Sequence, residues 1–178
     1  LPPTVQARLR DIVRAVELRG QVLEQWGFGR RLGAQRGLKI MFAGASGTGK
    51  SMAAALTAKE LALDLHRVEL SGIVSKYIGE TEKNLDRAFD AARSGNAILF
   101  IDEADALFGK RSEVKDAHDR YANVETAYLL QKMEDHDGVV ILATNLANNI
   151  DGAFSRRMHF AVEFPLPDVP RRERLWRG

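Results

Sequence analysis

The eight residues from Gly44 to Ser51, Gly-Ala-Ser-Gly-Thr-Gly-Lys-Ser, constrain the fold of this chain more than any other stretch. They follow an apolar run of strand length, Leu38 to Ala43, and precede an alanine-rich run that reaches Leu63. This order predicts a strand, a phosphate-binding loop and a helix, because glycines let backbone N–H groups turn inward and a helix N-terminus attracts anions. The alternative is a turn rich in glycine and serine that binds no ligand, and the flanking strand and helix argue against it.

Two side chains at the end of the loop have the chemistry of a nucleotide site. We expect Lys50 to reach the β- and γ-phosphates of ATP and the Ser51 hydroxyl to ligate Mg²⁺. The residues predicted to contact the nucleotide are Gly44, Ala45, Ser46, Gly47, Thr48, Gly49, Lys50, Ser51 and Met52.

Composition limits the setting in which such a site works. The 178 residues, 45% of them hydrophobic and 28% charged, fit one globular domain. The chain has no cysteine, which excludes disulfides, thiolate chemistry and cysteine-bound zinc. It starts at Leu1 and has neither a stretch of membrane-spanning length nor a visible leader, so we expect a cytoplasmic segment of a longer protein. A net charge of +2 with scattered basic residues argues against a nucleic-acid partner.

The remaining patterns predict strands that alternate with helices. The first helix covers Thr4 to Trp26 and is weakened near Gly20; Trp26 and the glycines beside it suggest core packing, or else a place beside the adenine. The other expected helices are Lys50–Leu63, Thr81–Ser94 with Thr81 as its cap, and about Arg120–Met133, after an exposed loop over Gly109–Asp119. The expected strands are Leu38–Ala43, His66–Leu70, Ala97–Ile101, Val139–Ala143 and Phe160–Phe164. This alternation predicts an α/β fold with a five-stranded parallel sheet.

Polar residues follow three of the expected strands, and parallel strands carry their ligand site beyond their carboxyl ends. Asp102 and Glu103 come at the end of one buried strand, and Asn145 just past another. We expect Asp102 to hold Mg²⁺, Glu103 to act as general base on the attacking water, and Asn145 to orient that water or bind the γ-phosphate. Ordinary acidic and asparagine turns at strand ends are the alternatives.

Six stretches of the chain form an ordered pattern: Gly44–Ser51, Lys76–Glu80, Ile98–Asp105, Ala143–Asn145, Asp151–Arg157 and Phe164–Asp168. The pattern resembles that of the AAA+ ATPases, specifically the AAA subfamily of ring-forming protein remodellers. In order, the stretches look like Walker A, the first pore loop, Walker B, sensor 1, the arginine-finger stretch and the exit toward a helical lid. Within the family, the runs 72–84 and 118–123 look like the ATPase of bacterial extracellular contractile injection particles.

The resemblance implies a three-layer αβα P-loop NTPase fold, the large subdomain of an AAA+ module without its lid. It implies an N-terminal helix and linker at 1–36, the nucleotide-binding core at 37–170 and the start of the lid at 171–178. It also implies a homohexamer that hydrolyses ATP and remodels a protein substrate, gripped at Lys76, Tyr77 and Ile78, with Arg156 and Arg157 completing the neighbouring subunit's site.

Two points depart from the family or stay open. The usual Arg-Pro-Gly-Arg spacing is shortened here to Arg156-Arg157, which leaves open which arginine acts in trans, and the sensor 2 arginine cannot be located in this sequence. Tyr77 in a partly buried loop and the two arginines in surface ion pairs are the structural alternatives. For the function, the alternatives are an ATP-driven assembly or disassembly switch that threads no substrate, and a small-molecule kinase or nucleic-acid motor.

Overall fold

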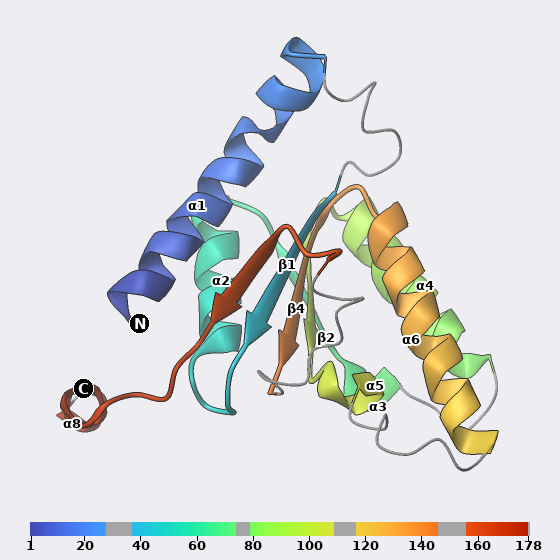
Figure 1. Cartoon of the computed structure of the whole chain (residues 1–178). Helices are drawn as coiled ribbons and strands as arrows, with labels where there is room; N and C mark the ends of the chain where they lie inside the picture. Colours follow the sequence, from blue (N-terminus) through green and yellow to red (C-terminus); the bar gives the residue numbers. More distant parts are fainter. Residues whose placement is uncertain (28–36, 74–78, 109–116, 146–155, 178) are drawn as a thin grey trace.

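The computed structural model describes residues 1–27, 37–73, 79–108, 117–145 and 156–177 (Figure 1). The helices are α1 (Pro3–Gly20), the π-helical turn η1 (Gln21–Gln25), α2 (Lys50–Glu60), α3 (Leu70–Ile73), α4 (Glu80–Ser94), α5 (Asp105–Phe108), α6 (Ala117–Asp135) and α8 (Val169–Arg177). The strands are β1 (Leu38–Ala43), β2 (Leu65–Glu69), β3 (Ile98–Asp102), β4 (Val139–Thr144) and β5 (Phe160–Glu163).

The strands form one five-stranded sheet in the order β2-β3-β4-β1-β5, and every neighbouring pair is parallel. The predicted α/β fold with a five-stranded parallel sheet is therefore confirmed. In the register, Ala43 at the end of β1 pairs with Thr144 at the end of β4, and Glu69 at the end of β2 pairs with Asp102 at the end of β3. All these strands end at the same edge of the sheet.

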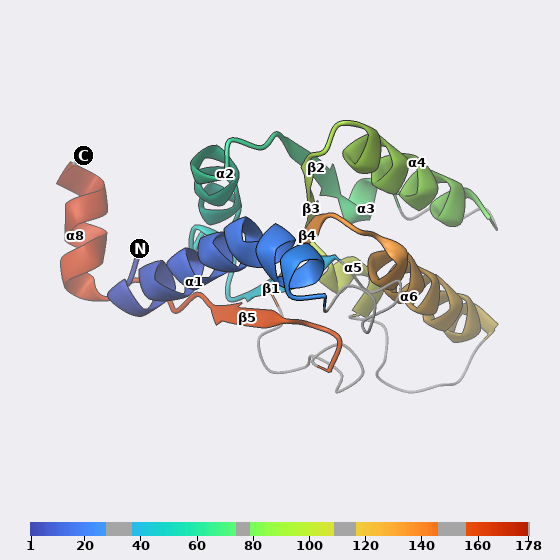
Figure 2. The same cartoon turned by 90° about the horizontal axis from the view of Figure 1, so that it is seen from above.

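Helices cover both faces of the sheet (Figures 1 and 2). Because side chains alternate along a strand, Ile98 and Phe100 of β3 pack toward α1 and α2, whereas Leu99 and Ile101 pack toward α4 and α6. On the first side, Ala53, Ala54 and Ala58 bring α2 close to the sheet, and α1 adds Val5, Leu9 and Ile12. The result is the expected three-layer αβα arrangement.

The loop between β1 and α2 requires glycine at its first position. Gly44 has a φ of +152°, and a Cβ atom there would lie 2.3 Å from the carbonyl oxygen of Phe164, just after β5. Its backbone N–H donates to the carbonyl of Thr144 at 3.1 Å. The loop therefore starts in a slot between the ends of two neighbouring strands, where no side chain fits.

Several predicted boundaries are wrong by a few residues. The strand predicted over 66–70 is shifted by one, since Leu70 already belongs to α3, and α2 ends three residues before Leu63. Thr81 does not cap α4: the capping position is Gly79 at φ +83°, and Thr81 is buried inside the first turn. The helix α6 starts at Ala117, inside the stretch predicted as an exposed loop.

The interpretation of Trp26 is also wrong. The first helix changes to π-helical hydrogen bonding after Gly20, as the predicted weakening there suggests, but the Trp26 side chain is 64% exposed and forms no core. The start of α1 lies by the phosphate loop, where Leu1 Cδ2 is 3.4 Å from a Cβ placed on Gly49. Trp26 is 25 residues along the chain from Leu1, so a helical rise of about 1.5 Å per residue puts it roughly 35 Å away, too far for the adenine.

No helix in the described part of the chain combines the length and apolar character that a membrane crossing needs. The division at residues 36 and 170 stays a prediction, although α8 already starts at Val169.

Replacing Gly44 by alanine should lower the free energy of unfolding by about 2–4 kcal/mol, because the new methyl group meets the backbone of Phe164. Gly20→Ala is the matched control: Gly20 has helical φ and ψ with no atom within 4 Å of its Cβ position, so alanine should stabilise by about 0.5–1 kcal/mol. Urea unfolding of the two variants measures both. Equal stabilities would contradict the tight approach of the strand ends at Gly44.

Candidate active site

Lys50, the first residue of α2, is held inside the loop that precedes it. Its side chain is almost fully buried, and its Nζ donates to the carbonyl oxygens of Gly44 at 2.6 Å and Ala45 at 2.9 Å and to Asn145 Oδ1 at 2.9 Å. Burial lowers the pKa of Lys50, and the negative charges of Asp102 and Asp105 oppose this shift. Three acceptors thus hold a cation at the place where a phosphate-binding loop needs one.

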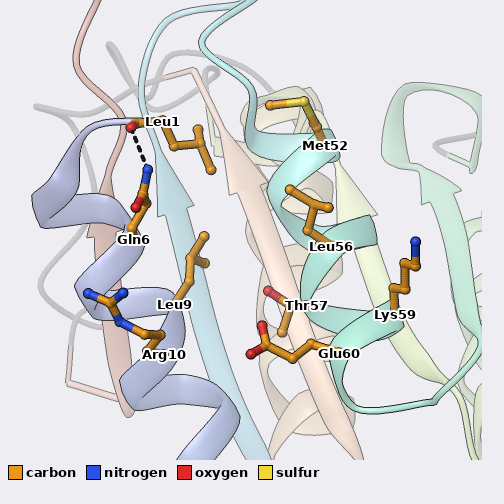
Figure 3. Close-up of a pocket in the computed structure, with 9 residues that line it drawn as sticks. All are labelled: Leu1, Gln6, Leu9, Arg10, Met52, Leu56, Thr57, Lys59 and Glu60. Carbon is orange, nitrogen blue, oxygen red and sulfur yellow. Dashed lines mark hydrogen bonds between the residues drawn. The ribbon is translucent and has the colours of Figure 1, made fainter.

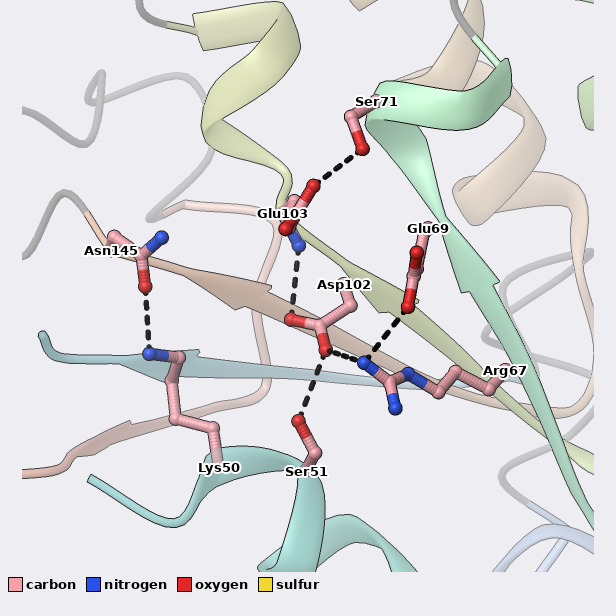
Figure 4. Close-up of polar contacts among 8 residues, drawn as sticks. All are labelled: Lys50, Ser51, Arg67, Glu69, Ser71, Asp102, Glu103 and Asn145. Atoms are coloured by element: carbon pink, nitrogen blue, oxygen red, sulfur yellow. Dashed lines mark hydrogen bonds and ion pairs between the residues drawn. The ribbon is translucent and has the colours of Figure 1, made fainter. Parts of the chain in front are cut away.

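Ser51 and Asp102 bring a hydroxyl and a carboxylate together beside Lys50 (Figure 4). Ser51 Oγ donates to Asp102 Oδ2 at 3.0 Å. Asp102 is buried and is the last residue of β3. Mg²⁺ prefers such oxygens and commonly takes only one or two protein ligands, keeping water and phosphate oxygens for the rest. The donor set fits a magnesium site formed with a bound nucleotide.

Glu103 has a backbone conformation that is rare for its residue type. Its φ is +55°, and its backbone N–H donates to Asp102 Oδ1 at 3.0 Å. The turn directs the exposed side chain toward α3, where its carboxylate accepts a hydrogen bond from the Ser71 hydroxyl. A strained non-glycine residue directly after a buried carboxylate is typical of functional sites.

Asn145 joins the site from the end of β4. Besides accepting from Lys50, it donates its backbone N–H to Asp105 Oδ1 at 3.2 Å, which ties the end of β4 to the start of α5. The structure therefore brings together all five polar residues predicted for one subunit's site: Lys50, Ser51, Asp102, Glu103 and Asn145.

The match to known proteins agrees with this geometry. Residues 40–166 match the model of the ATPase family associated with various cellular activities, AAA. The chain belongs to the AAA family.

Curated relatives share about a third of the aligned residues with this AAA domain. It is 36% identical over 139 residues to the uncharacterized AAA family ATPase y4kL of Sinorhizobium fredii, covering 76% of this chain and 42% of the relative. It is also 36% identical over 144 residues to vacuolar protein sorting-associated protein 4B of Mus musculus (78% and 32%), and 35% over 152 residues to the cell division cycle protein 48 homolog of Archaeoglobus fulgidus (82% and 20%). The match spans less than half the length of each of these relatives.

The two arginines of the predicted finger stretch lie away from the domain's own phosphate loop. They precede β5, where His159 N–H donates to the carbonyl of Lys39 near the start of β1. Lys39 and Gly44 are five residues apart on a strand, roughly 16 Å at about 3.3 Å per residue. Arg157 pairs with Glu134 at the end of α6, and Arg156 is exposed. The structure therefore does not bring Arg156 or Arg157 to the site of their own subunit.

The predicted pore-loop residues Lys76, Tyr77 and Ile78 fall outside the described residues. The loop residues Gly47, Thr48 and Gly49, together with Met52, line a cavity of about 310 Å³ whose other walls are Leu1, Pro2, Pro165, Pro167 and Arg171. Ser46 lies in the same loop but does not line this cavity.

A larger cavity of about 660 Å³ lies between α1 and α2 (Figure 3). It shares Leu1 and Met52 with the smaller one, but only the smaller one is lined by the loop residues Gly47, Thr48 and Gly49. Since the glycine loop is where phosphates are expected to bind, we assign the site to the loop and the cavity that it lines rather than to the larger one.

Four side chains that contact the site were not predicted: Arg67 and Glu69 of β2, Ser71 of α3 and Asp105 of α5. The first three lie at or just past the end of β2, which pairs in parallel with β3, so they reach the same edge of the sheet as Asp102. Charged residues at alternate positions near the end of that strand point to the site once the strand order is known.

Proposed function

We propose that this AAA domain binds ATP with Mg²⁺ and hydrolyses it to ADP and phosphate. The observation that carries the proposal is the convergence of Lys50, Ser51, Asp102, Glu103 and Asn145 at the carboxyl ends of β1, β3 and β4. The cavity of about 310 Å³ beside the loop is the place we propose for the nucleoside.

Each residue has a task that its position allows. Lys50 neutralises the β- and γ-phosphate charge, exchanging its carbonyl acceptors for phosphate oxygens. Ser51 and Asp102 would hold Mg²⁺, which supplies further positive charge at the phosphates. Glu103 takes a proton from the water that attacks the γ-phosphorus, and the Asn145 amide orients this water or the γ-phosphate. Glu103 must first leave the Ser71 hydroxyl, so its rotation gates the reaction.

Lys50→Met and Glu103→Gln should separate binding from hydrolysis. Loss of the Lys50 charge should weaken ATP binding about 10- to 100-fold, since a hydrogen bond to a charged group contributes about 1.5–3 kcal/mol. Glu103→Gln should leave ATP binding intact and slow phosphate release about 10²- to 10⁴-fold, because the general base is lost.

Equilibrium binding of fluorescent ATP and a phosphate-release assay measure the two effects. Lys59→Met and Glu60→Gln change the same residue types on the exposed end of α2 and should behave as wild type. Unimpaired turnover by Glu103→Gln would remove Glu103 as the base.

We further propose that the full-length protein works as a ring, most simply a hexamer, in which Arg156 completes the neighbouring site. Two observations support this: the arginines lie far from their own loop, and the Arg157 guanidinium pairs with Glu134 of its own subunit. Arginine suits the task because its fork binds phosphate oxygens and stays charged.

Arg156→Ala should reduce ATP hydrolysis by the full-length protein at least about 10²-fold, because an arginine finger contributes about 10³- to 10⁵-fold. Subunits with Arg156→Ala mixed with Glu103→Gln subunits should regain part of the activity, since some interfaces then combine an intact Glu103 with an intact Arg156. Arg157→Ala is the control and should cost less. No recovery in the mixture argues against action in trans.

We propose that the ring couples hydrolysis to remodelling, translocating or unfolding a protein in the cytoplasm, with Lys76, Tyr77 and Ile78 as its pore loop. Six motifs in family order support this, but the pore loop itself is a sequence-based proposal.

The narrower resemblance of runs 72–84 and 118–123 leads us to propose that the protein acts on a contractile injection particle. Genes for sheath and tube proteins beside this one would support that role, and their absence would argue against it.

Tyr77→Ala in the full-length protein should abolish work on a protein substrate while basal hydrolysis stays near the wild-type rate, because an aromatic in the channel grips the chain and takes no part in chemistry. Unfolding of a fluorescent model substrate and phosphate release, measured side by side, test this. Tyr77→Phe keeps the ring and is the matched control. Unchanged substrate work in Tyr77→Ala would instead favour an assembly switch that threads nothing.

A further inference from the structure

Arg67 places a second cation at the carboxylate proposed to hold Mg²⁺. Its guanidinium lies 3.0 Å from Asp102 Oδ2, the same oxygen that accepts from Ser51 (Figure 4). The same guanidinium nitrogen lies 3.1 Å from Glu69 Oε1. Arg67 thus bridges the candidate metal ligand and a second carboxylate.

The strand register explains this arrangement. Glu69 pairs with Asp102 across β2 and β3, and Arg67 stands two residues before Glu69. Side chains two apart on a strand share a face, and Val68 between them packs toward α4 and α6. Arg67, Glu69 and Asp102 therefore lie on the face of the sheet that α2 covers, and the first turn of α2 carries Ser51.

The Oδ2 oxygen of Asp102, which faces Ser51, has no spare lone pair for another close cation. The Oδ1 oxygen accepts the Glu103 N–H, and Oδ2 accepts from both Ser51 and Arg67. A carboxylate oxygen has two lone pairs, so a cation approaching Oδ2 must displace one donor. Ser51 can keep its hydrogen bond while its oxygen faces a metal ion, whereas the positive guanidinium is repelled by one.

We propose that Arg67 competes with the divalent cation for Asp102 and so weakens the hold of this site on magnesium–nucleotide, with Glu69 as the carboxylate that retains Arg67 when the metal binds. The inference rests on the proposed nucleotide site. It makes Arg67 a positioning residue that acts through Asp102.

Exposure supports an exchange of partners at this place. The side chains of Arg67 and Glu69 are 51% and 58% exposed, whereas that of Asp102 is 12% exposed. The Arg67 guanidinium therefore has room to move toward Glu69, and Asp102 stays fixed at the end of a buried strand. Because arginine does not lose its charge, the competition persists over the whole physiological pH range.

The test measures how strongly Mg²⁺ tightens the binding of fluorescent ADP, as the ratio of the dissociation constant in EDTA to that in saturating Mg²⁺. Arg67→Gln should raise this ratio about threefold to tenfold, since a partly exposed ion pair contributes about 1 kcal/mol. Glu69→Gln should lower the ratio, because Arg67 then has only Asp102 as a partner.

Two control variants separate contact from general charge. Arg87→Gln removes the same charge from an exposed position on α4 and should leave the ratio unchanged. Arg67→Lys keeps the charge but shortens the side chain, so it should move the ratio partway toward that of Arg67→Gln. A wild-type ratio in Arg67→Lys would show that the positive charge acts at a distance, without contact to Asp102, and would overturn the proposed competition.

Other outcomes are equally decisive. An unchanged ratio in Arg67→Gln overturns the proposal. Weaker ADP binding by Arg67→Gln in EDTA would show that Arg67 binds phosphate directly, which also overturns it. Failure of the wild-type protein to bind ADP at all would instead reject the nucleotide site, and the inference with it.

Discussion

The parallel pairing of β1 with β4 and of β2 with β3 is the constraint on which the candidate site depends. Ala43, the last residue of β1, pairs with Thr144, the last residue of β4, and Glu69 of β2 pairs with Asp102 of β3. The residues that follow these four strands therefore lie at one edge of the sheet. Backbone hydrogen bonds fix the loops that follow: Gly44 N–H donates to Thr144, and Ala104 N–H donates to Ala143 at 2.9 Å. The central strands β3 and β4 are buried on both faces, so the polar groups at their ends are held rigidly. Positioning a phosphate requires such rigidity.

Each charged side chain at this edge of the sheet has a hydrogen-bond or ion-pair partner that a bound ligand could replace. Lys50 is buried, which costs free energy unless its three protons find acceptors, and the two loop carbonyls and Asn145 supply them. Arg67 shares Asp102 with Ser51, and Glu103 is hydrogen bonded to Ser71. Binding of a nucleotide and its metal ion would replace these contacts with new ones, in which each charged side chain again meets a partner of opposite charge. Such a site exchanges hydrogen bonds on binding and leaves few charges without partners.

The same fold explains why one subunit holds only part of the proposed machinery. The phosphate loop follows the carboxyl end of β1, whereas Arg156 and Arg157 precede the start of β5, at the opposite edge of the sheet. A parallel sheet separates these two edges by the length of its strands. This separation is the structural support for our proposal that a second copy of the chain completes the site.

The sequence by itself determined the fold class, the five strands and the residues Lys50, Ser51, Asp102, Glu103 and Asn145, because a loop motif and buried apolar runs are local patterns. The predicted helix starts at Thr81 and about Arg120 are wrong, because Gly79 occupies the capping position of α4 and α6 already begins at Ala117. Only the tertiary structure decided which strands are neighbours. The contacts of Arg67 with Asp102 and of Ser71 with Glu103 join residues more than 30 positions apart, and they exist because β2 lies beside β3. Strand order is a property of the packed sheet, and no spacing along the chain encodes it.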